Sequence, residues 1–335
     1  MNQTNNTMRL VNFNQYGGPE QLQLNAVSCP EPGIGQVRIK MKGLALNRSN
    51  SLFLKGNYLF DASFPSRIGT EGTGIIDALG VGVTGVKLGQ RVNLLPPHNE
   101  SESGYAADFN IVAANNLLPS PTGLDDRQAA TAWVPYLTLY NLFVEKGLAA
   151  EGKWIVLPAA SSSVSLAANN LAHHLGAKTI GLTRTVAKAE ALKAAGYDAI
   201  VITQTDDISA SIKKITGEGA DFVFDPVGGS QLESLIASVK PGAVINVYGL
   251  LDPGETKLPI FTLMNSGATI SAYTVYELVT DPIRMKAAIA YFLPLFNNGS
   301  LTPTVDPQHF SLNQISDAFS YLESNDQFGK VIVGF

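Results

Sequence analysis

The chain has 335 residues, a length that corresponds to about two domains of ordinary size. With 45 % hydrophobic and 15 % charged residues it can bury a sizeable core, which excludes intrinsic disorder and collagen-like structure. The 23 basic and 28 acidic residues give a net charge of −5 and form no basic cluster, so we expect no nucleic-acid partner.

The sequence also bears on compartment and metal content. It contains no run of about 18 apolar residues, so we expect no membrane partner. Its single cysteine, Cys29, cannot form an internal disulfide, and we expect a cytoplasmic protein. One cysteine and four histidines are too few to predict a zinc site, so we expect no bound metal. The first seven residues are polar, lack the features of a signal peptide and predict a short tail.

Residues 8–125 have the pattern of a β domain. Apolar and polar residues alternate at 37–41, and further strands are predicted at 72–79 and 90–95. Clusters of glycine and proline separate these segments, as is typical of turns between strands. The region predicts an all-β unit, built as a partly open barrel.

From about residue 128, predicted strands and helices alternate. Such alternation indicates right-handed βαβ units and a doubly wound parallel sheet. The strands are predicted at 153–157, 177–182, 199–202, 221–225 and 243–247, and the helices at 164–175, 186–195, 207–216 and 231–239.

After about residue 275 the alternation stops. Helices are predicted at 283–296 and 315–322, and a strand at 330–335 ends the chain. Because no helix follows this last strand, we expect it to return to the first domain.

Residues 80–85 match the G-x-G-x-x-G pattern of dinucleotide-binding loops. That pattern binds a diphosphate only where its last glycine opens a helix, because the helix N-terminus holds the phosphates. A turn and a strand follow here, so the motif predicts a β-hairpin connection with glycines at positive φ.

The candidate phosphate loop follows the strand at 153–157 and contains no glycine. Small side chains let the backbone approach a diphosphate, and serine hydroxyls and the free N–H groups of a helix start can donate to it. The alternative is a plain serine N-cap of the next helix. The candidate binding residues are Ser161, Ser162, Ser163 and Val164.

The end of the second predicted strand carries cations where an NAD site would carry an acid. Thr183 and Arg184 stand at this position, and Lys188 lies one helical turn further on. A guanidinium there can bind a 2′-phosphate, which favours NADPH over NADH. The alternative is two solvated surface cations.

At these residues the chain resembles the medium-chain dehydrogenase/reductase superfamily, and within it the zinc-independent branch of quinone oxidoreductases and enoyl reductases. The resemblance covers nearly the whole chain. The segments that carry it are Asn47 with 56–58, then 69–74, 83–92, 137–140, 225–229 and 329–333. It implies an α/β protein with a GroES-like β-barrel catalytic domain at 1–127 and 276–335, and a Rossmann domain at 128–275.

The resemblance implies NADPH as cofactor and a quinone or α,β-unsaturated carbonyl as the small-molecule hydride acceptor. Asn47 and Tyr58 are the candidate catalytic residues, Tyr58 as a donor to the oxygen that becomes negative. Packing of the Tyr58 ring on the barrel is the alternative. Further candidate cofactor contacts are Asn47, Thr138, Tyr248, Gly249, Leu250 and Lys330.

The chain departs from the family in two places. Serines at 162, 163 and 165 replace glycines, and we expect the last of them to loosen the packing of the helix on the strand. Asn50 stands where relatives often carry Asp. Asn47 and Thr70 occupy positions where zinc-dependent alcohol dehydrogenases carry metal ligands, in agreement with the expected absence of metal.

Other functions remain open. One is an enoyl-thioester reductase, and another is a non-catalytic NADPH-binding sensor or regulatory protein, which the glycine-free loop favours. An RNA-binding role, which some crystallin-like relatives suggest, conflicts with the acidic net charge. The family also implies a homodimer formed through the sheet edge near residues 269–273.

Overall fold

The computed structural model describes residues 7–335, and their packing divides them into two compact units. Unit 1 comprises residues 7–134, 293–299 and 303–335, and unit 2 comprises residues 135–292 and 300–302. A short tail was predicted over the first seven residues, and positions 1–6 of it lie outside the described residues. Thr7 differs from that prediction, because it pairs with Ser28 in the first strand.

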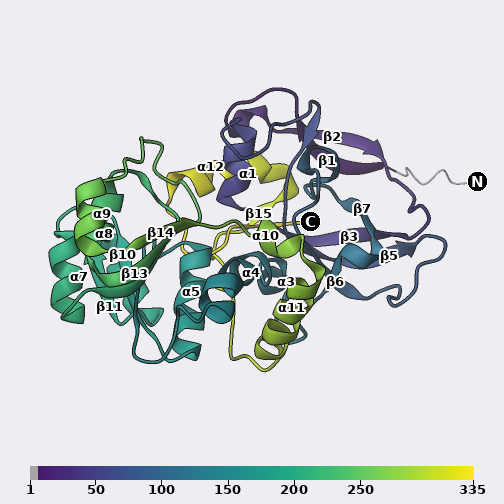
Figure 1. The fold of residues 1–335 in the computed structure, drawn as a ribbon. Helices are drawn as coiled ribbons and strands as arrows, with labels where there is room; N and C mark the ends of the chain where they lie inside the picture. Colours follow the sequence, from purple (N-terminus) through teal and green to yellow (C-terminus); the bar gives the residue numbers. More distant parts are fainter. Residues whose placement is uncertain (1–6) are drawn as a thin grey trace, which may run out of the picture. The chain divides into compact units, whose positions relative to one another are not determined.

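Unit 1 contains a seven-stranded sheet in the order β15-β16-β3-β5-β6-β8, with β7 paired to β3. Figure 1 labels β3, β5, β6, β7 and β15 of this sheet. The last strand of the chain, β16, runs antiparallel to β3, so the C-terminal segment returns to the first unit as predicted. The strands are β3 Gln36–Ala45, β5 Gly72–Leu79, β6 Arg91–Leu94, β7 Phe109–Ala113, β8 Leu117–Pro119, β15 Phe310–Ser311 and β16 Ile332–Gly334.

A second sheet of unit 1 has three antiparallel strands in the order β2-β1-β4. Its strands are β1 Thr7–Phe13, β2 Gln23–Ser28 and β4 Ser66–Arg67. Phe13 of β1 belongs to the same buried cluster as Val37 and Ile39 of β3, so the two sheets share one core. The alternation at 37–41 is confirmed, since Val37, Ile39 and Met41 are buried and Lys40 is exposed.

Short helices cover unit 1. α1 is fixed against α12 by Arg48, whose Nη2 donates to the carbonyl oxygen of Leu322 at 2.8 Å. The helices are α1 Arg48–Leu54, α2 Glu100–Ser103, α3 Asp126–Ala130 and α12 Ile315–Ser324, with 3₁₀ turns at Pro19–Gln21, Ala114–Asn116 and Leu312–Gln314.

Unit 2 is built on a six-stranded, fully parallel sheet in the order β11-β10-β9-β12-β13-β14. Counted along the chain this is 3-2-1-4-5-6, the order of a Rossmann fold, which confirms the predicted doubly wound sheet. The strands are β9 Trp154–Leu157, β10 Lys178–Thr183, β11 Ala199–Ile202, β12 Ala220–Asp225, β13 Val239–Val247 and β14 Thr269–Ala272.

Helices connect these parallel strands, and each predicted helix is present. The segment predicted at 186–195 begins as a 3₁₀ turn, and the strand predicted at 243–247 begins four residues earlier. The elements are α4 Val134–Leu139, a π-helix Tyr140–Glu145, α5 Ser163–His174, the 3₁₀ turn Val186–Lys188, α6 Ala189–Ala194, α7 Ile208–Thr216, the 3₁₀ turn Gly229–Gln231, α8 Leu232–Ala237, α9 Ile260–Ser266, α10 Tyr276–Val279 and α11 Pro282–Asn297.

The observed division of the chain differs from the boundaries predicted at 127/128 and 275/276. Residues 128–134 belong to unit 1. One reason is that the side-chain amide of Asn93 donates to the carbonyl oxygen of Ala129. Residues 276–292 belong to unit 2. There Arg284 of α11 forms an ion pair with Glu145, and the Phe292 ring packs on Tyr136 and Tyr140.

The glycine motif at 80–85 lies between β5 and β6, which pair antiparallel, and no helix follows it. The predicted hairpin connection is therefore confirmed. Gly82 and Gly85 have φ of +79° and +81°, whereas Gly80 does not have positive φ. Gly80 is required for space instead, because a Cβ there would lie 1.8 Å from the carbonyl oxygen of Gly33.

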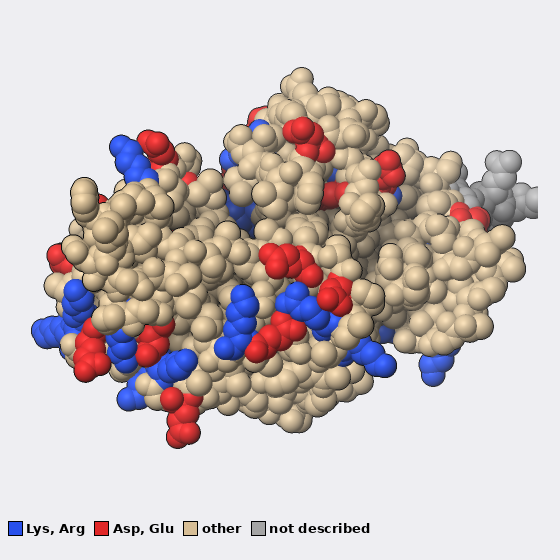
Figure 2. Space-filling view, viewed as in Figure 1, with Lys and Arg blue, Asp and Glu red and all other residues tan. Residues whose placement is uncertain are grey.

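Figure 2 shows acidic and basic side chains interspersed on the face that it presents. Within residues 7–335, no helix combines the length and apolar character needed to cross a bilayer.

Candidate functional site

In unit 2, the loop between β9 and α5 forms part of the carboxyl edge of the parallel sheet. Ser162 is the N-cap of α5, and its Oγ accepts the backbone N–H of Ser165 at 3.2 Å. The Ser162 hydroxyl also donates to Ser165 Oγ, which in turn donates to the carbonyl oxygen of Pro158. The N-cap interpretation therefore holds for Ser162, whose hydroxyl is used within the loop.

The same loop contains features that the sequence did not reveal. Ala159 has a φ of +48°, a left-handed conformation that usually favours glycine. The Tyr197 hydroxyl lies 2.8 Å from the carbonyl oxygen of Ala160 and 3.0 Å from that of Ser165. Ser165 is completely buried, and its hydroxyl donates to the carbonyl oxygen of Pro158. A glycine at position 165 could not make this hydrogen bond. No local sequence pattern predicts a tyrosine bracing a loop that is more than 30 positions away.

Ser161 and the predicted cations lie close to this loop. Lys188 donates from Nζ to Ser161 Oγ at 3.2 Å, so the structure joins the loop after β9 to the turn after β10. Arg184 is exposed immediately after β10, and its guanidinium has no hydrogen-bond or ion-pair partner within residues 7–335. Thr183 is buried as the last residue of β10, and Val164 is half-buried in the first turn of α5.

The ends of β12 and β13 form a second part of the same edge. The Tyr248 ring stacks on Phe224 with centroids 4.0 Å apart, and burial raises the pKa of the Tyr248 hydroxyl. Asp225 accepts the backbone N–H of Val227 at 2.8 Å, and burial raises the pKa of this carboxyl to about 6. The remaining predicted contacts are Gly249 (half-buried), Leu250 (51 % exposed) and Thr138 (buried, in α4).

In unit 1, Lys330 is almost completely buried and has two partners. Its Nζ donates to Asn47 Oδ1 at 2.6 Å and lies 3.0 Å from Glu71 Oε2. The other oxygen of Glu71 accepts the backbone N–H of Val134 at 2.8 Å. The buried ammonium is therefore neutralised within the fold, and Asn47 and Lys330, both predicted as site residues, are in direct contact.

Asn47 stands at the N-cap of α1 and joins a larger polar cluster. Its backbone N–H donates to Asn50 Oδ1 at 2.9 Å. Both side-chain amides donate to the same atom, Thr70 Oγ1, from 3.3 Å for Asn47 and from 3.1 Å for Asn50. Asn50, the residue that departs from the family, is completely buried.

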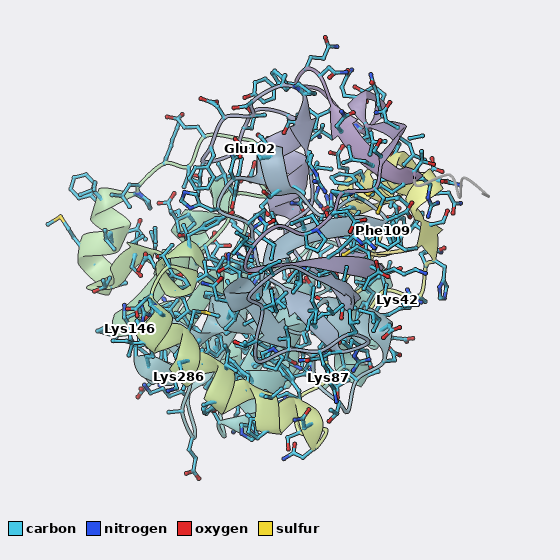
Figure 3. All side chains as sticks on the ribbon, turned by 90° about the vertical axis from the view of Figure 1, so that its right-hand side faces the viewer. Lys42, Lys87, Glu102, Phe109, Lys146 and Lys286 are labelled. Atoms are coloured by element: carbon cyan, nitrogen blue, oxygen red, sulfur yellow. The ribbon has the colours of Figure 1, made fainter. Side chains whose placement is uncertain are left out.

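Glu100 completes this cluster and was not identified from the sequence. Its Oε1 accepts the side-chain amide of Asn50 and the backbone N–H of Gly69, each at 2.8 Å. Burial raises the pKa of Glu100 to about 7. Glu100 is the first residue of α2, the short helix whose Glu102 is labelled in Figure 3. A glutamate in a polar segment gives no local signal that it will bond to Asn50 and Gly69.

Tyr58 follows α1 and packs on the core of unit 1. Its ring meets Phe60 edge-to-face with centroids 6.0 Å apart, and it is half-buried. These contacts agree with the interpretation that the Tyr58 ring packs on the barrel. A chemical role for the Tyr58 hydroxyl is a proposal.

Metal-ligating side chains do not gather at this cluster. Among residues 7–335, no group of three or more histidine, cysteine, aspartate or glutamate residues is arranged to hold a metal ion. Asn47 and Thr70, at the two positions compared with zinc ligands, are hydrogen-bonded to each other.

Two protein-family models match the chain. The alcohol dehydrogenase GroES-like domain matches residues 33–122, and the zinc-binding dehydrogenase model matches residues 163–292. The synaptic vesicle membrane protein VAT-1 homolog of Homo sapiens is 24 % identical over 97 % of this chain and 86 % of its own length. The quinone oxidoreductase of Pseudomonas aeruginosa is 25 % identical over 96 % of this chain and 98 % of its own length.

A solved structure has the same fold. The crystal structure of Escherichia coli quinone oxidoreductase complexed with NADPH matches with a TM-score of 0.88 and 24 % identity, over 98 % of this chain and 100 % of that one. Together with the GroES-like match, it confirms the predicted fold class, a GroES-like domain with a Rossmann domain.

Proposed function

Since the chain belongs to the medium-chain dehydrogenase/reductase superfamily, we propose that it is an NADPH-dependent oxidoreductase. The hydride acceptor is a quinone or an α,β-unsaturated carbonyl compound, and the reaction uses no zinc. The E. coli relative was crystallised with NADPH, and that supports the choice of cofactor. A homodimer formed through the edge strand β14 is part of the same proposal.

The observation that carries the proposal is the group of cations beside the serine loop. Lys188 reaches Ser161, Arg184 is exposed with no partner among residues 7–335, and residues 183–188 contain no acid. A ribose 2′-hydroxyl is bound by an acid at this place in a Rossmann fold, whereas a 2′-phosphate requires a cation. The residues present therefore fit NADPH better than NADH.

Each group of unit 2 has a role in this proposal. The free backbone N–H groups at the start of α5, with Ser161, Ser163 and Val164, receive the diphosphate. Arg184 and Lys188 hold the 2′-phosphate. Thr138, Thr183, Tyr248, Gly249 and Leu250 contact the remainder of the nucleotide.

The residues of unit 1 orient the reactants and stabilise developing charge. When bound, NADPH supplies a hydride from C4 of its nicotinamide. Asn47 orients the nicotinamide, Lys330 fixes the Asn47 amide, and Tyr58 donates to the substrate oxygen. In place of a metal, uncharged donors such as a phenol and amides support the oxyanion, which is the chemistry expected of a zinc-free site.

One observation favours a second function, that of a weakly binding NADPH sensor. The hydroxyls of Ser162 and Ser165 are used inside the loop, so fewer donors remain for a diphosphate than the number of serines implies. An enoyl-thioester reductase is a third possibility, which differs only in the acceptor.

The test is to titrate the purified protein with NADPH and then to follow NADPH absorbance with an ortho-quinone, an enone and an enoyl thioester. We expect nucleotide binding and NADPH oxidation with the quinone or the enone, unchanged by chelators. Binding without oxidation would establish the sensor. Preference for the thioester would establish the third function, and no binding at millimolar NADPH would overturn all three.

A further inference from the structure

The buried hydroxyl of Thr70 accepts hydrogen bonds from its neighbours and donates none to them. Its side chain is 3 % exposed, and Oγ1 has two neighbours within hydrogen-bonding distance, the side-chain nitrogens of Asn47 and Asn50. A hydroxyl has two acceptor positions and one proton to donate. If both amides donate, the Thr70 proton must point to a third group.

The orientation of each amide is determined by partners that have only one possible role. Lys330 can only donate, so the atom of Asn47 that faces it is the oxygen, and the Asn47 nitrogen faces Thr70. The backbone N–H of Asn47 can only donate, so it faces the oxygen of Asn50. Rotating either amide by 180° would set two donors against each other.

Glu100 confirms the orientation of Asn50 from the opposite side. Its Oε1 already accepts the backbone N–H of Gly69, and it faces the nitrogen of Asn50 at 2.8 Å. The Asn50 nitrogen therefore donates one proton to Glu100 and the other to Thr70. An aspartate at position 50 would have no proton for either partner, and its charge would face that of Glu100.

Both acceptor positions of Thr70 are thus occupied, and its O–H has no acceptor in residues 7–335. Buried polar groups are nearly always paired, because an unpaired group loses its hydrogen bonds to water and gains none in return. The Thr70 O–H is therefore available to donate to an acceptor on a bound molecule.

We propose that the Thr70 hydroxyl is a catalytic hydrogen-bond donor to the substrate oxygen that becomes negative when hydride is transferred. The proposal rests on the function proposed above and names the group that stabilises its oxyanion, in addition to Tyr58. The buried ammonium of Lys330 strengthens this donor, because it polarises the Asn47 amide and the amide in turn polarises the hydroxyl.

The reaction balances without ionising Thr70. Hydride brings two electrons and a hydrogen to the β-carbon of an enone, and the π electrons move toward the carbonyl oxygen to give an enolate. Thr70 holds that oxygen by its O–H and keeps its proton, and water supplies the proton that completes the ketone. With a quinone, the same hydrogen bond stabilises the hydroquinone anion until water protonates it.

The first experiment compares Thr70→Val and Thr70→Ser with wild type, using NADPH and an enone. The valine has the shape of threonine without the hydroxyl, and we expect about 100-fold lower kcat, the loss typical of one removed oxyanion donor. The serine should remain within about threefold of wild type. The NADPH dissociation constant should change less than twofold in both.

Thr73→Val is the matched control. Thr73 is also buried in unit 1, but its hydroxyl donates internally, to the carbonyl oxygen of Val92 at 2.9 Å. Its loss lowers stability and should leave kcat within twofold of wild type. An equal fall of kcat in both valine variants would reduce Thr70 to a structural residue and overturn the proposal.

A second variant serves if Thr70→Val does not fold. Asn47→Asp keeps the shape and the contact with Lys330 but turns the nitrogen that faces Thr70 into an acceptor, so the hydroxyl proton rotates inward. We expect a similar loss in kcat. Where Thr70→Val does fold, the double variant Asn47→Asp with Thr70→Val should lose little more than either single variant. Full activity of Asn47→Asp would contradict the proposal.

Failure of this inference differs from failure of the proposed function. If wild type and Thr70→Val oxidise NADPH equally well, the enzyme stands and the donor is elsewhere. If wild type and Thr73→Val bind NADPH but reduce no acceptor, the enzymatic function fails, and with it the role of Thr70.

Discussion

The two units treat the cations of their candidate sites in opposite ways. In unit 1, Lys330 is 2 % exposed and paired with Glu71, so its charge is neutralised by the chain itself. In unit 2, Arg184 is exposed and has no partner within residues 7–335. A cation paired inside the fold cannot be removed without leaving its partner's charge buried and unpaired, whereas a solvated cation is available for a ligand. Substitutions should therefore affect folding in unit 1 and affinity in unit 2.

The largest effect is expected for Lys330→Met. It leaves the Glu71 carboxylate buried without its cation, a change that typically costs about 3–5 kcal/mol of unfolding free energy. Lys240→Met is the control, because the Lys240–Asp221 pair is partly exposed and such pairs contribute about 1 kcal/mol or less. Urea denaturation measures both, and similar midpoints for the two variants would remove the distinction between the units.

The next effect is a pH dependence from Glu100, whose pKa is about 7 in the fold against 4.5 as its ordinary value. The folded state binds this proton more tightly, so the contribution to stability is complete below pH 4.5 and is lost as pH rises through 7. The span of 2.5 pKa units corresponds to about 3 kcal/mol.

Glu100→Gln should remove this dependence. The variant keeps an oxygen for Asn50 and Gly69, so it should gain up to about 3 kcal/mol over wild type between pH 4.5 and 8. Tyr105 interacts with Glu100 and with Arg67, and the pKa values of Tyr105 and Arg67 lie above this range, so neither titrates in it. If the free energy of unfolding depended on pH in the same way in wild type and variant, the pKa of Glu100 would not be raised in the fold.

A smaller free-energy change is expected in unit 2 and should appear only in binding. Arg184→Ala removes charge-assisted hydrogen bonds to a 2′-phosphate, worth about 1.5–3 kcal/mol, so NADPH should bind about 10- to 100-fold more weakly. NADH binding and the urea midpoint should not change. Equal weakening of both nucleotides would remove the 2′-phosphate assignment.

Gly85→Ala should have the opposite effect to Arg184→Ala, because it should change stability and not NADPH binding. Gly85 has a φ of +81° with open space around it, so an alanine introduces only backbone strain, about 1–2 kcal/mol. Stability should fall while the affinity for NADPH is unchanged, because the 80–85 motif lies in a hairpin. Weaker NADPH binding in this variant would reopen the assignment of the phosphate loop.

The two candidate sites also differed in how far they could be predicted. In unit 2, the end of β10 and the start of α5 follow from periodicity, so Arg184, Lys188 and the serine loop could be located along the chain before their contacts were known. In unit 1, Asn47 and Lys330 were named only through resemblance to a family. Nothing local indicates their bond, since 283 positions separate them.

The sequence by itself determined the alternation of strands and helices that makes the sheet of unit 2 parallel, and the hairpin at 80–85. These features depend on side-chain periodicity and on backbone preferences, which are properties of neighbouring residues. Only the tertiary structure decided that Ala159 adopts positive φ, that Tyr197 braces the serine loop, and that Glu100 and Asn50 orient the donors around Thr70. Hydrogen-bond direction depends on every partner of an atom, and here those partners come from distant parts of the chain that meet only when it folds.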